Sequence, residues 1–330
     1  MLSDPLPKLS VSNPKPRPVI SVIIPAYNEQ DFIESTLLSL RNSDYPKEKF
    51  EIIVVDNGST DQTTEIAKQH TDVLLHLPDG NVGAVRNHGA KKAAGDFIAF
   101  LDADCEVSQD WLANLELLLT ETKDTAFGGT CRSPKNSSWI ERYWLLGNGQ
   151  KKQKDLVGAC IGISKPDFFL IGGFREDLTS GEDTDLSNRL RSMNISVIVN
   201  KNLTVQHAGN AKTISKFIQR QIWHSENYLR DPRATAKDPT FILCALALLL
   251  FLFMIFSIPI NMTISVLILF SLLLIIGLFS LKRMIYAKFF TIKPIELLKI
   301  YSLDALYVSG RCTGIVISIA KLMKSEKNKT

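Results

Sequence analysis

The chain has 330 residues, of which 45% are hydrophobic and 22% charged, and its formal net charge at pH 7 is +4. This length is enough for one large domain or two ordinary ones with a substantial core. The five cysteines are odd in number and lack paired spacing. They favour a reducing, cytoplasmic compartment and argue against a disulfide framework or a zinc site.

Residues 1–18 are rich in proline and serine and contain no apolar stretch. We expect a flexible arm and no signal peptide there. As far as residue 130, short apolar runs then alternate with helical patterns. The predicted strands are residues 19–25, 51–56, 73–77 and 97–102. Strands that alternate with helices predict a mostly parallel sheet covered by helices on both faces.

Polar clusters follow three of these strands: "AYNE", "DNGSTD" and "DAD". Ligands bind beyond the carboxyl ends of the strands in such sheets, so we expect the three clusters to meet in one crevice. Locally, Asn28 is expected to cap the helix after the first strand. Ser59 or Thr60 is expected to cap the helix after the second.

The region that follows is less regular. Residues 131–155 are polar and rich in loops, which indicates an insertion on the acceptor side of a binding site. Residues 156–165 ("LVGACIGISK") are typical of another strand. The segment "ISKFIQRQIWHSENYLR" is predicted to be a helix that leads toward an apolar region.

That apolar region, residues 240–281, contains 42 residues without a single charged side chain. A helix needs about 20 apolar residues to cross a bilayer, so the region is long enough for two spans. Pro259 and Asn261 lie at its middle, where a helix would break and turn. We predict two transmembrane helices, residues 241–258 and 263–281.

Basic residues flank this hairpin. Lys237 precedes it and Lys282 and Arg283 follow it, so the positive-inside rule places both ends in the cytoplasm, with the catalytic domain there. Residues 282–330 carry ten Lys and Arg against three acidic residues, a net charge of +7 that anionic lipids attract. Residues 294–323 are predicted to form an amphipathic helix at the membrane surface, with a third span as the alternative. Nucleic-acid binding is not predicted, because no recognition motif accompanies the charge.

The "DAD" cluster is the first sign of chemistry. Two carboxylates held this close, Asp102 and Asp104, repel each other unless a cation lies nearby. Mg²⁺ and Mn²⁺ prefer one or two carboxylates together with substrate phosphates, so the pair predicts such a metal bound with a diphosphate. Taken alone, the pair is also consistent with solvated or capping acids. A calcium EF-hand is excluded, because Val107 and Ala113 stand where glycine and glutamate are required.

Five motifs occur in order along the chain: "ISVIIPAYNE", "EIIVVDNGSTD", "GNVGAVRNHGA", "FIAFLDAD" and "GGFREDLTSGEDTDLSNRL". Together they resemble family 2 glycosyltransferases of the GT-A fold, from about Val19 to Trp223. The resemblance implies an α/β nucleotide-diphospho-sugar transferase domain over residues 19–232. Its nucleotide-binding half would be residues 19–130 and its acceptor half residues 131–232.

The resemblance also implies roles for single residues. Those implied to bind the nucleotide sugar are Pro25, Ala26, Tyr27, Glu29, Asp56, Arg86, Asp102 and Asp104. Tyr27 would lie against the base and Asp56 would accept a hydrogen bond from it. Arg86 would reach the nucleotide, where a planar guanidinium suits phosphate or carboxylate. Asp102 would face the ribose or the metal, and Asp104 would ligate the metal. Simpler alternatives are a turn acid for Asp56 and a surface ion pair for Arg86.

The motif "GEDTDL" implies the catalytic base. In the family the aspartate of the Glu-Asp pair has this role, which makes Asp183 the candidate and Glu182 the second choice. A base is needed because an acceptor hydroxyl must lose its proton as it attacks the anomeric carbon. The attack would be in line and invert that carbon. The alternative is that these acids only favour a helix N-terminus.

The resemblance implies roles for two further residues. His207 would be an additional metal ligand, although a lone histidine is more often packed or hydrogen-bonded. Trp223 would line the acceptor site. In "QRQIW", Ile222 stands where processive synthases of the family have arginine. This difference, together with a single hairpin, argues against processive polymerisation.

The sequence therefore predicts a membrane-anchored, inverting, Mn²⁺- or Mg²⁺-dependent glycosyltransferase. It would move sugar from a nucleotide-sugar donor, first of all a UDP-sugar, to a lipid-linked or saccharide acceptor at the cytoplasmic face. Two alternatives remain: transfer to polyprenyl phosphate itself, and a catalytically inactive membrane scaffold that binds sugar nucleotides. A dinucleotide dehydrogenase is excluded, because the first strand ends in "PAYNE" without a glycine-rich turn.

Overall fold

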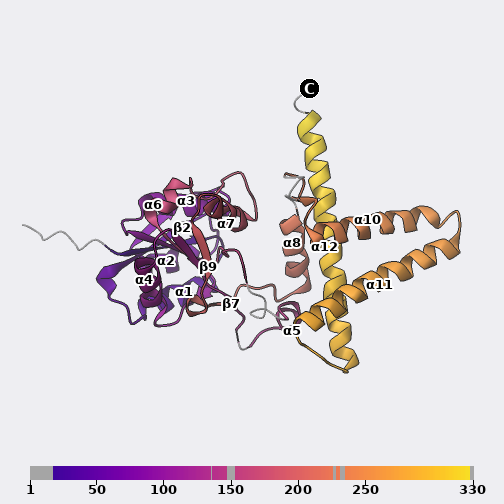
Figure 1. Cartoon of the computed structure of the whole chain (residues 1–330), viewed down its shortest axis with the longest axis horizontal. Helices are drawn as coiled ribbons and strands as arrows, with labels where there is room; N and C mark the ends of the chain where they lie inside the picture. Colours follow the sequence, from indigo (N-terminus) through magenta and orange to yellow (C-terminus); the bar gives the residue numbers. More distant parts are fainter. Residues whose placement is uncertain (1–17, 135, 147–152, 226–227, 231–234, 328–330) are drawn as a thin grey trace, which may run out of the picture.

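The computed structural model describes residues 18–134, 136–146, 153–225, 228–230 and 235–327. The flexible arm expected over residues 1–18 therefore lies outside the described residues, apart from Pro18. Figure 1 shows an α/β body formed by the first part of the chain, followed by a group of long helices. The α/β domain with a mostly parallel central sheet is confirmed.

The central sheet has seven strands in the order β3-β2-β1-β4-β8-β6-β9. Their bounds are β1 Ile20–Ala26, β2 Phe50–Asp56, β3 Val73–His76, β4 Phe97–Leu101, β6 Thr125–Gly128, β8 Cys160–Ser164 and β9 Ser196–Val199. The first four run parallel, as predicted, whereas β8 is antiparallel to both of its neighbours. A smaller sheet of β5 Cys105–Glu106, β10 Val205–His207 and β7 Cys131–Arg132 lies at the end of β4.

Helices cover both faces of the central sheet and form two separate apolar layers. On one face lie α1 Ile33–Arg41, α2 Thr63–His70 and α4 Trp111–Glu121. On the other lie α3 Val82–Lys92, α6 Lys165–Leu170 and α7 Glu182–Ser192. Short 3₁₀ turns occur at Lys47–Lys49, Lys201–Leu203 and Tyr228–Arg230. Because side chains on both faces are buried, the central strands show unbroken apolar runs without polar alternation.

The two predicted helix caps are wrong, and the reason bears on the site. Helix α1 begins after Phe32 and α2 after Gln62, and neither has a side-chain cap. Instead, the Oδ1 atom of Asn28 accepts the backbone N–H of Thr60 at 2.8 Å, and Ser59 Oγ accepts the N–H of Asn28 at 3.0 Å. These polar residues tie together the ends of two neighbouring parallel strands.

The remaining helices are α5 Trp139–Trp144, α8 Ile214–Ser225, α10 Pro239–Ser257, α11 Met262–Tyr286 and α12 Pro294–Lys327. Helices α10 and α11 form the expected hairpin, and the side chain of Asn261 caps α11. Figure 1 shows α12 lying across the base of this hairpin instead of alongside it. Within the described residues, three helices are long and apolar enough to cross a membrane: α10, α11 and residues 294–323 of α12.

One boundary of the hairpin differs from the prediction. Helix α11 continues to Tyr286, so Lys282 and Arg283 lie inside the helix and not after it. Arg283 is neutralised there by the buried Asp304 of α12. It also donates to the backbone carbonyls at the end of α5, at 2.7 and 2.9 Å. A long helix can therefore carry this charge, because other elements of the chain satisfy it.

Helix α12 packs closely against α8 through two glycines of the segment "GRCTG". A Cβ at Gly310 would lie 2.8 Å from the Cβ of Gln221, and one at Gly314 would lie 2.5 Å from the carbonyl oxygen of Ile222. Glycines four residues apart allow two helix backbones to approach each other in this way. The spacing therefore places the Arg311 side chain beside α8.

Candidate active site

The carboxyl ends of β1 and β4, the small sheet and the N-terminus of α7 surround an open cleft of about 650 Å³. All but one of the residues predicted for the site line this cleft. They are Pro25, Ala26, Tyr27, Glu29, Arg86, Asp102, Asp104, Glu182, Asp183, His207 and Trp223. The rings of Tyr27 and Trp223 are exposed. Topology explains the convergence, because the carboxyl ends of parallel strands lie at one edge of a sheet.

Asp56 is the predicted residue that does not line the cleft. Its side chain is buried and accepts the backbone N–H groups of Gly58 at 3.1 Å and Ser59 at 3.2 Å. Its Oδ2 atom also lies 3.4 Å from the Nδ1 atom of His76. In this structure Asp56 shapes the turn after β2, and its neighbour Asn57 lines the cleft in its place.

Arg86, on α3, joins two of the predicted acids. Its Nη2 atom lies 2.7 Å from Oδ1 of Asp102, and its Nη1 atom lies 2.7 Å from Oε1 of Glu182. The Arg86 side chain is 3% exposed, so its guanidinium is engaged with protein acids and is not free in the cleft. Burial raises the pKa of Glu182, although Arg86 opposes this effect. The structure thus connects the predicted metal-binding motif to the predicted catalytic motif through one buried cation.

Asp183 is better placed than Glu182 to act as a base. It is only partly buried, in the first turn of α7, whereas Glu182 is buried against Arg86. Its Oδ2 atom accepts the backbone N–H of Gly158 at 3.1 Å, and Oδ1 accepts that of Thr184 at 2.7 Å. These bonds hold the carboxylate at the cleft while leaving acceptor capacity on its oxygens.

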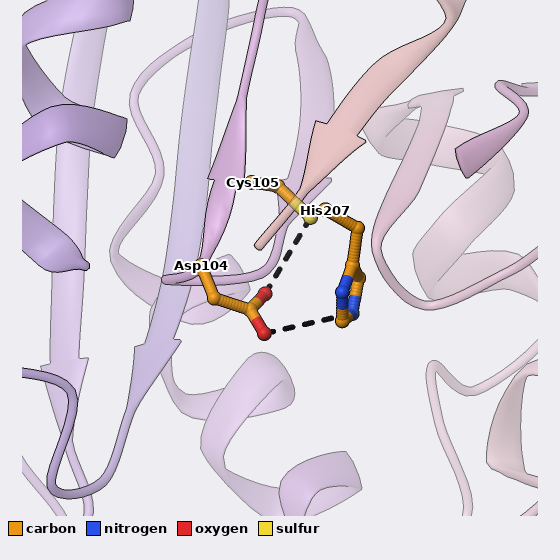
Figure 2. A group of neighbouring side chains, drawn as sticks. All are labelled: Asp104, Cys105 and His207. Atoms are coloured by element: carbon orange, nitrogen blue, oxygen red, sulfur yellow. Dashed lines mark hydrogen bonds and ion pairs between the residues drawn. The ribbon is translucent and has the colours of Figure 1, made fainter. Parts of the chain in front are cut away.

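A potential metal group lies at the end of β4. Asp104, Cys105 and His207 each place one possible ligand atom within 4.8 Å of the others (Figure 2). Strand pairing explains this, because β10 runs antiparallel to β5 with His207 opposite Cys105. Oδ2 of Asp104 lies 3.5 Å from Nε2 of His207. The Nδ1 atom of His207 is buried and has no hydrogen-bond partner among the described residues.

The chemistry of this group fits a divalent cation in part. Carboxylate and imidazole are acceptable ligands for Mn²⁺. Burial, with the nearby carboxylates of Asp102 and Asp104, raises the pKa of the Cys105 thiol far above its usual value, so the thiol stays neutral and is a poor ligand. Asp102, predicted as a second ligand, is not in the group, because its carboxylate faces Arg86. Asp104 and His207 are therefore the residues that fit the metal.

The electrostatics of the cleft favour a cation at this end. Its lining contains five carboxylates and three guanidinium groups, a formal balance of −2. Burial, followed by the charges of Asp104 and Asp102, raises the pKa of Glu29 to about 7. Burial and the charge of Asp102 likewise raise the pKa of Asp104, against the opposing effect of His207. A bound cation would relieve this crowding of negative charge.

Sequence reasoning missed three cationic or titratable residues of the cleft: Arg132, Arg220 and His224. Arg220 and His224 flank Trp223 on α8, and residues 220, 223 and 224 lie on one helix face at i, i+3 and i+4. This spacing was available in the sequence once Trp223 had been chosen. Arg132 lies on the two-residue strand β7 and has no local signal.

Comparisons with known proteins agree with the fold described above. The family model for glycosyl transferase family 2 matches residues 21–171. Glycosyltransferase AglE of Haloferax volcanii is 34% identical over 185 residues, which cover 52% of this chain and 61% of AglE. The poly(ribitol-phosphate) beta-N-acetylglucosaminyltransferase TarS of Staphylococcus aureus is 36% identical over 107 residues, 31% of this chain and 19% of TarS. The chain thus spans less than two thirds of the length of either relative.

Among solved structures, the mannosyltransferase PcManGT from Pyrobaculum calidifontis, in complex with GDP-Man and Mn²⁺, matches with a TM-score of 0.52. The two chains are 22% identical, and the match covers 98% of this chain and 92% of that one. This likeness concerns the fold. The family model over residues 21–171 and the curated relatives support a glycosyltransferase of family 2.

Proposed function

We propose that this protein is a membrane-anchored, metal-dependent, inverting glycosyltransferase that acts in the synthesis of a cell-surface polysaccharide or glycolipid. The observation that carries the proposal is the shared cleft, in which the Asp104 and His207 group and the Asp183 carboxylate face one space of about 650 Å³. The names of relatives support this pathway class, since TarS is named a poly(ribitol-phosphate) beta-N-acetylglucosaminyltransferase and TuaG of Bacillus subtilis a putative teichuronic acid biosynthesis glycosyltransferase.

The reaction follows from the placement of these residues. Asp104 and His207 would hold Mn²⁺ or Mg²⁺, which when bound neutralises charge on the departing nucleoside diphosphate. Asp183 accepts the proton of the attacking acceptor hydroxyl. Arg86 keeps Asp102 and Glu182 in place beneath the donor site through two ion pairs. Attack from the side opposite the leaving group inverts the anomeric carbon. The donor is a nucleotide sugar, with a UDP-sugar as the first choice.

The apolar helices support attachment to a membrane. Helix α10 has 19 residues and α11 has 25, which at about 1.5 Å per residue suit a hydrocarbon core of about 30 Å. We propose that these two helices span the membrane with the catalytic domain on the cytoplasmic side. Helix α12 then lies at the membrane surface. Its position across the base of the hairpin and its partly buried apolar face support this placement (Figure 1).

The proposal is tested with the full chain in membranes. Membranes are incubated with a panel of radiolabelled nucleotide sugars, with Mn²⁺, with Mg²⁺ or with EDTA, and labelled lipid or glycan is then extracted. We expect at least one donor to be consumed only when metal is present. If no donor is consumed with either Mn²⁺ or Mg²⁺, the proposed function is wrong. Nucleotide binding without turnover would instead support the inactive scaffold.

A variant pair tests the assigned base. Asp183→Asn should lower kcat by about 10²–10⁴-fold, the usual contribution of a general base, while donor binding persists. Asp185→Asn is the matched control, because Asp185 lies on the same helix but pairs with Arg189 and does not line the cleft. An Asp183→Asn enzyme that keeps most of its activity would favour transfer to polyprenyl phosphate, since a phosphate acceptor needs no strong base.

A further inference from the structure

A second, smaller cavity of about 180 Å³ lies between the catalytic domain and α12. It shares Leu145, Asn210, Arg220 and His224 with the lining of the cleft, so the two spaces adjoin. Its far wall includes Arg311 of α12. A cavity needs only about 15 Å³ to hold one water molecule, so this space is large enough for a phosphate group. We call it the small cavity.

The small cavity has the opposite charge to the cleft. Its lining contains two guanidinium groups, Arg220 and Arg311, and one carboxylate, Glu141, a formal balance of +1. Oε2 of Glu141 accepts the backbone N–H of Ser138 at 2.7 Å, whereas its Oε1 atom is buried without a partner among the described residues. Burial, together with Arg311 and Arg220, lowers the pKa of His224 to about 3. His224 is therefore neutral near pH 7, and the two arginines dominate the electrostatics of the small cavity.

Several polar atoms around the small cavity have no partner. The Nε atom of Arg311 and the side-chain amide oxygen of Gln221 are buried without a hydrogen bond among the described residues. Gln221 is 3% exposed, and its amide can be turned to present its NH₂ group instead. Arg311 is held in place by the rings of Tyr228 and Tyr307, at 5.8 and 5.2 Å. The Nε–H of Arg311 is thus a preoriented donor without a partner, and a turned Gln221 amide would supply a second donor, as is typical of a site that binds an anion.

We propose that Arg220 and Arg311, with Gln221 and His224, form a binding site for the phosphate or diphosphate group of a lipid-linked acceptor. The inference rests on the proposed function and names its acceptor class. The net negative cleft takes the donor with its metal and repels a second anion, whereas the small cavity attracts one. With the lipid phosphate in the small cavity, the acceptor sugar attached to it extends into the adjoining cleft toward Asp183.

The position of the small cavity matches a lipid substrate. Arg311 belongs to α12, which lies across the base of the hairpin (Figure 1). If α10 and α11 span the membrane as proposed, this base lies at the level of the lipid headgroups. Close packing at Gly310 and Gly314 brings α12 against α8, so the membrane helix and the catalytic domain each supply one arginine. An acceptor in the membrane can therefore reach this site without leaving the lipid.

The test uses the full chain in detergent with EDTA, so that a diphosphate cannot bind through a metal in the cleft. The probes are farnesyl diphosphate, farnesol, inorganic pyrophosphate and phosphatidylglycerol, with binding measured by calorimetry. We expect farnesyl diphosphate to bind more tightly than pyrophosphate or phosphatidylglycerol, and farnesol not to bind. Arg311→Gln and Arg220→Gln should each weaken binding by about tenfold to a hundredfold, as expected for a charge-assisted hydrogen bond.

Controls separate binding from folding. Arg142→Gln changes an exposed arginine of α5 outside the small cavity and should leave binding unchanged. Arg311→Lys keeps the charge without the planar fork and should bind with intermediate affinity, while its Tm shows whether the fold is intact. Equal binding by wild type and both glutamine variants would overturn the proposal. So would binding of farnesol, or pyrophosphate or phosphatidylglycerol binding as tightly as farnesyl diphosphate.

The same variants distinguish this inference from the proposed function. If no nucleotide sugar is consumed but Arg311-dependent binding persists, the enzyme proposal fails and the anion site stands. If sugar is transferred to an uncharged acceptor and Arg311→Gln leaves the acceptor KM unchanged, the enzyme proposal stands and the anion site fails. The expected result in turnover is a raised acceptor KM with little change in kcat.

Discussion

Replacing Arg86 with methionine removes the buried cation between Asp102 and Glu182 while keeping most of the side-chain volume. The side chain of Glu182 is 8% exposed and that of Asp102 is 30% exposed. The cost should therefore arise mainly at Glu182, which would be left as an uncompensated buried charge. Breaking a buried pair in this way costs about 3–5 kcal/mol. For a domain of roughly 200 residues, each kcal/mol lowers Tm by about 2–4 °C, so we expect a fall of about 6–20 °C.

The stability lost in Arg86→Met should depend on pH, and the protonation of Glu182 determines the direction of this dependence. Burial already raises the pKa of Glu182 in the native protein, and Arg86 opposes this rise. Without Arg86 the folded-state pKa rises further above the unfolded value. At low pH Glu182 is protonated and tolerates burial, so the variant keeps its stability. As the pH rises through the folded-state pKa, Glu182 ionises and this stability is lost. The deficit of Arg86→Met relative to wild type should therefore be greatest at pH values above the folded-state pKa of Glu182 and shrink as the pH is lowered through it.

Thermal unfolding followed by intrinsic fluorescence, at a series of pH values in one detergent, measures this difference. Arg191→Met is the matched control, because Arg191 pairs at 2.7 Å with Asp155 and both side chains are exposed, at 38% and 41%. A surface pair of this kind contributes about 0–1 kcal/mol. A deficit for Arg86→Met no larger than that of the control, or one that does not change with pH, would refute the reasoning.

Three further changes test other parts of the structure. Asp104→Asn should weaken Mn²⁺ binding, followed by electron paramagnetic resonance, by about tenfold to a hundredfold, and unchanged affinity would remove Asp104 from the metal site. Gly314→Leu should cost about 1–3 kcal/mol of stability through overpacking against Ile222, and a native Tm would show that α8 and α12 are not tightly packed. Arg283→Met should lower stability by about 3–5 kcal/mol because it leaves Asp304 buried and unpaired. Adding Asp304→Asn should restore most of that loss, and failure to do so would show that the carbonyl contacts of Arg283 matter more than the ion pair.

The pattern of apolar residues along the chain was sufficient to place most of the strands and the hairpin of apolar helices. The strands β1 to β4 were predicted to within one residue at each end, because each is a short, mainly apolar run. In β1, β2 and β4 these runs reflect burial on both faces of the sheet. The hairpin of α10 and α11 was equally clear, since no charge interrupts 42 residues. The resemblance to the family then supplied the order of the motifs, and eleven of the twelve residues assigned to the site line the cleft.

The interactions between these elements were not visible in the sequence. The two acids of the "DAD" cluster, Asp102 and Asp104, were predicted to share a metal. In the structure Asp102 instead pairs with Arg86, and Asp104 lies beside His207. Asn28 was predicted to cap a helix and instead joins two strand ends. In each case the partner lies on a different element, and a polar side chain pairs with whichever group tertiary packing brings within reach.

The amino-acid sequence by itself determined which segments are strands, which helices are apolar enough for a membrane, and where acids follow strands, because these depend on neighbours along the chain. Only the tertiary structure decided which charges meet. Arg220 and Arg311 line one cavity although 91 positions separate them, because two glycines allow α12 to pack directly on α8. Electrostatic interactions depend on distance in space, and that distance exists only in the folded protein.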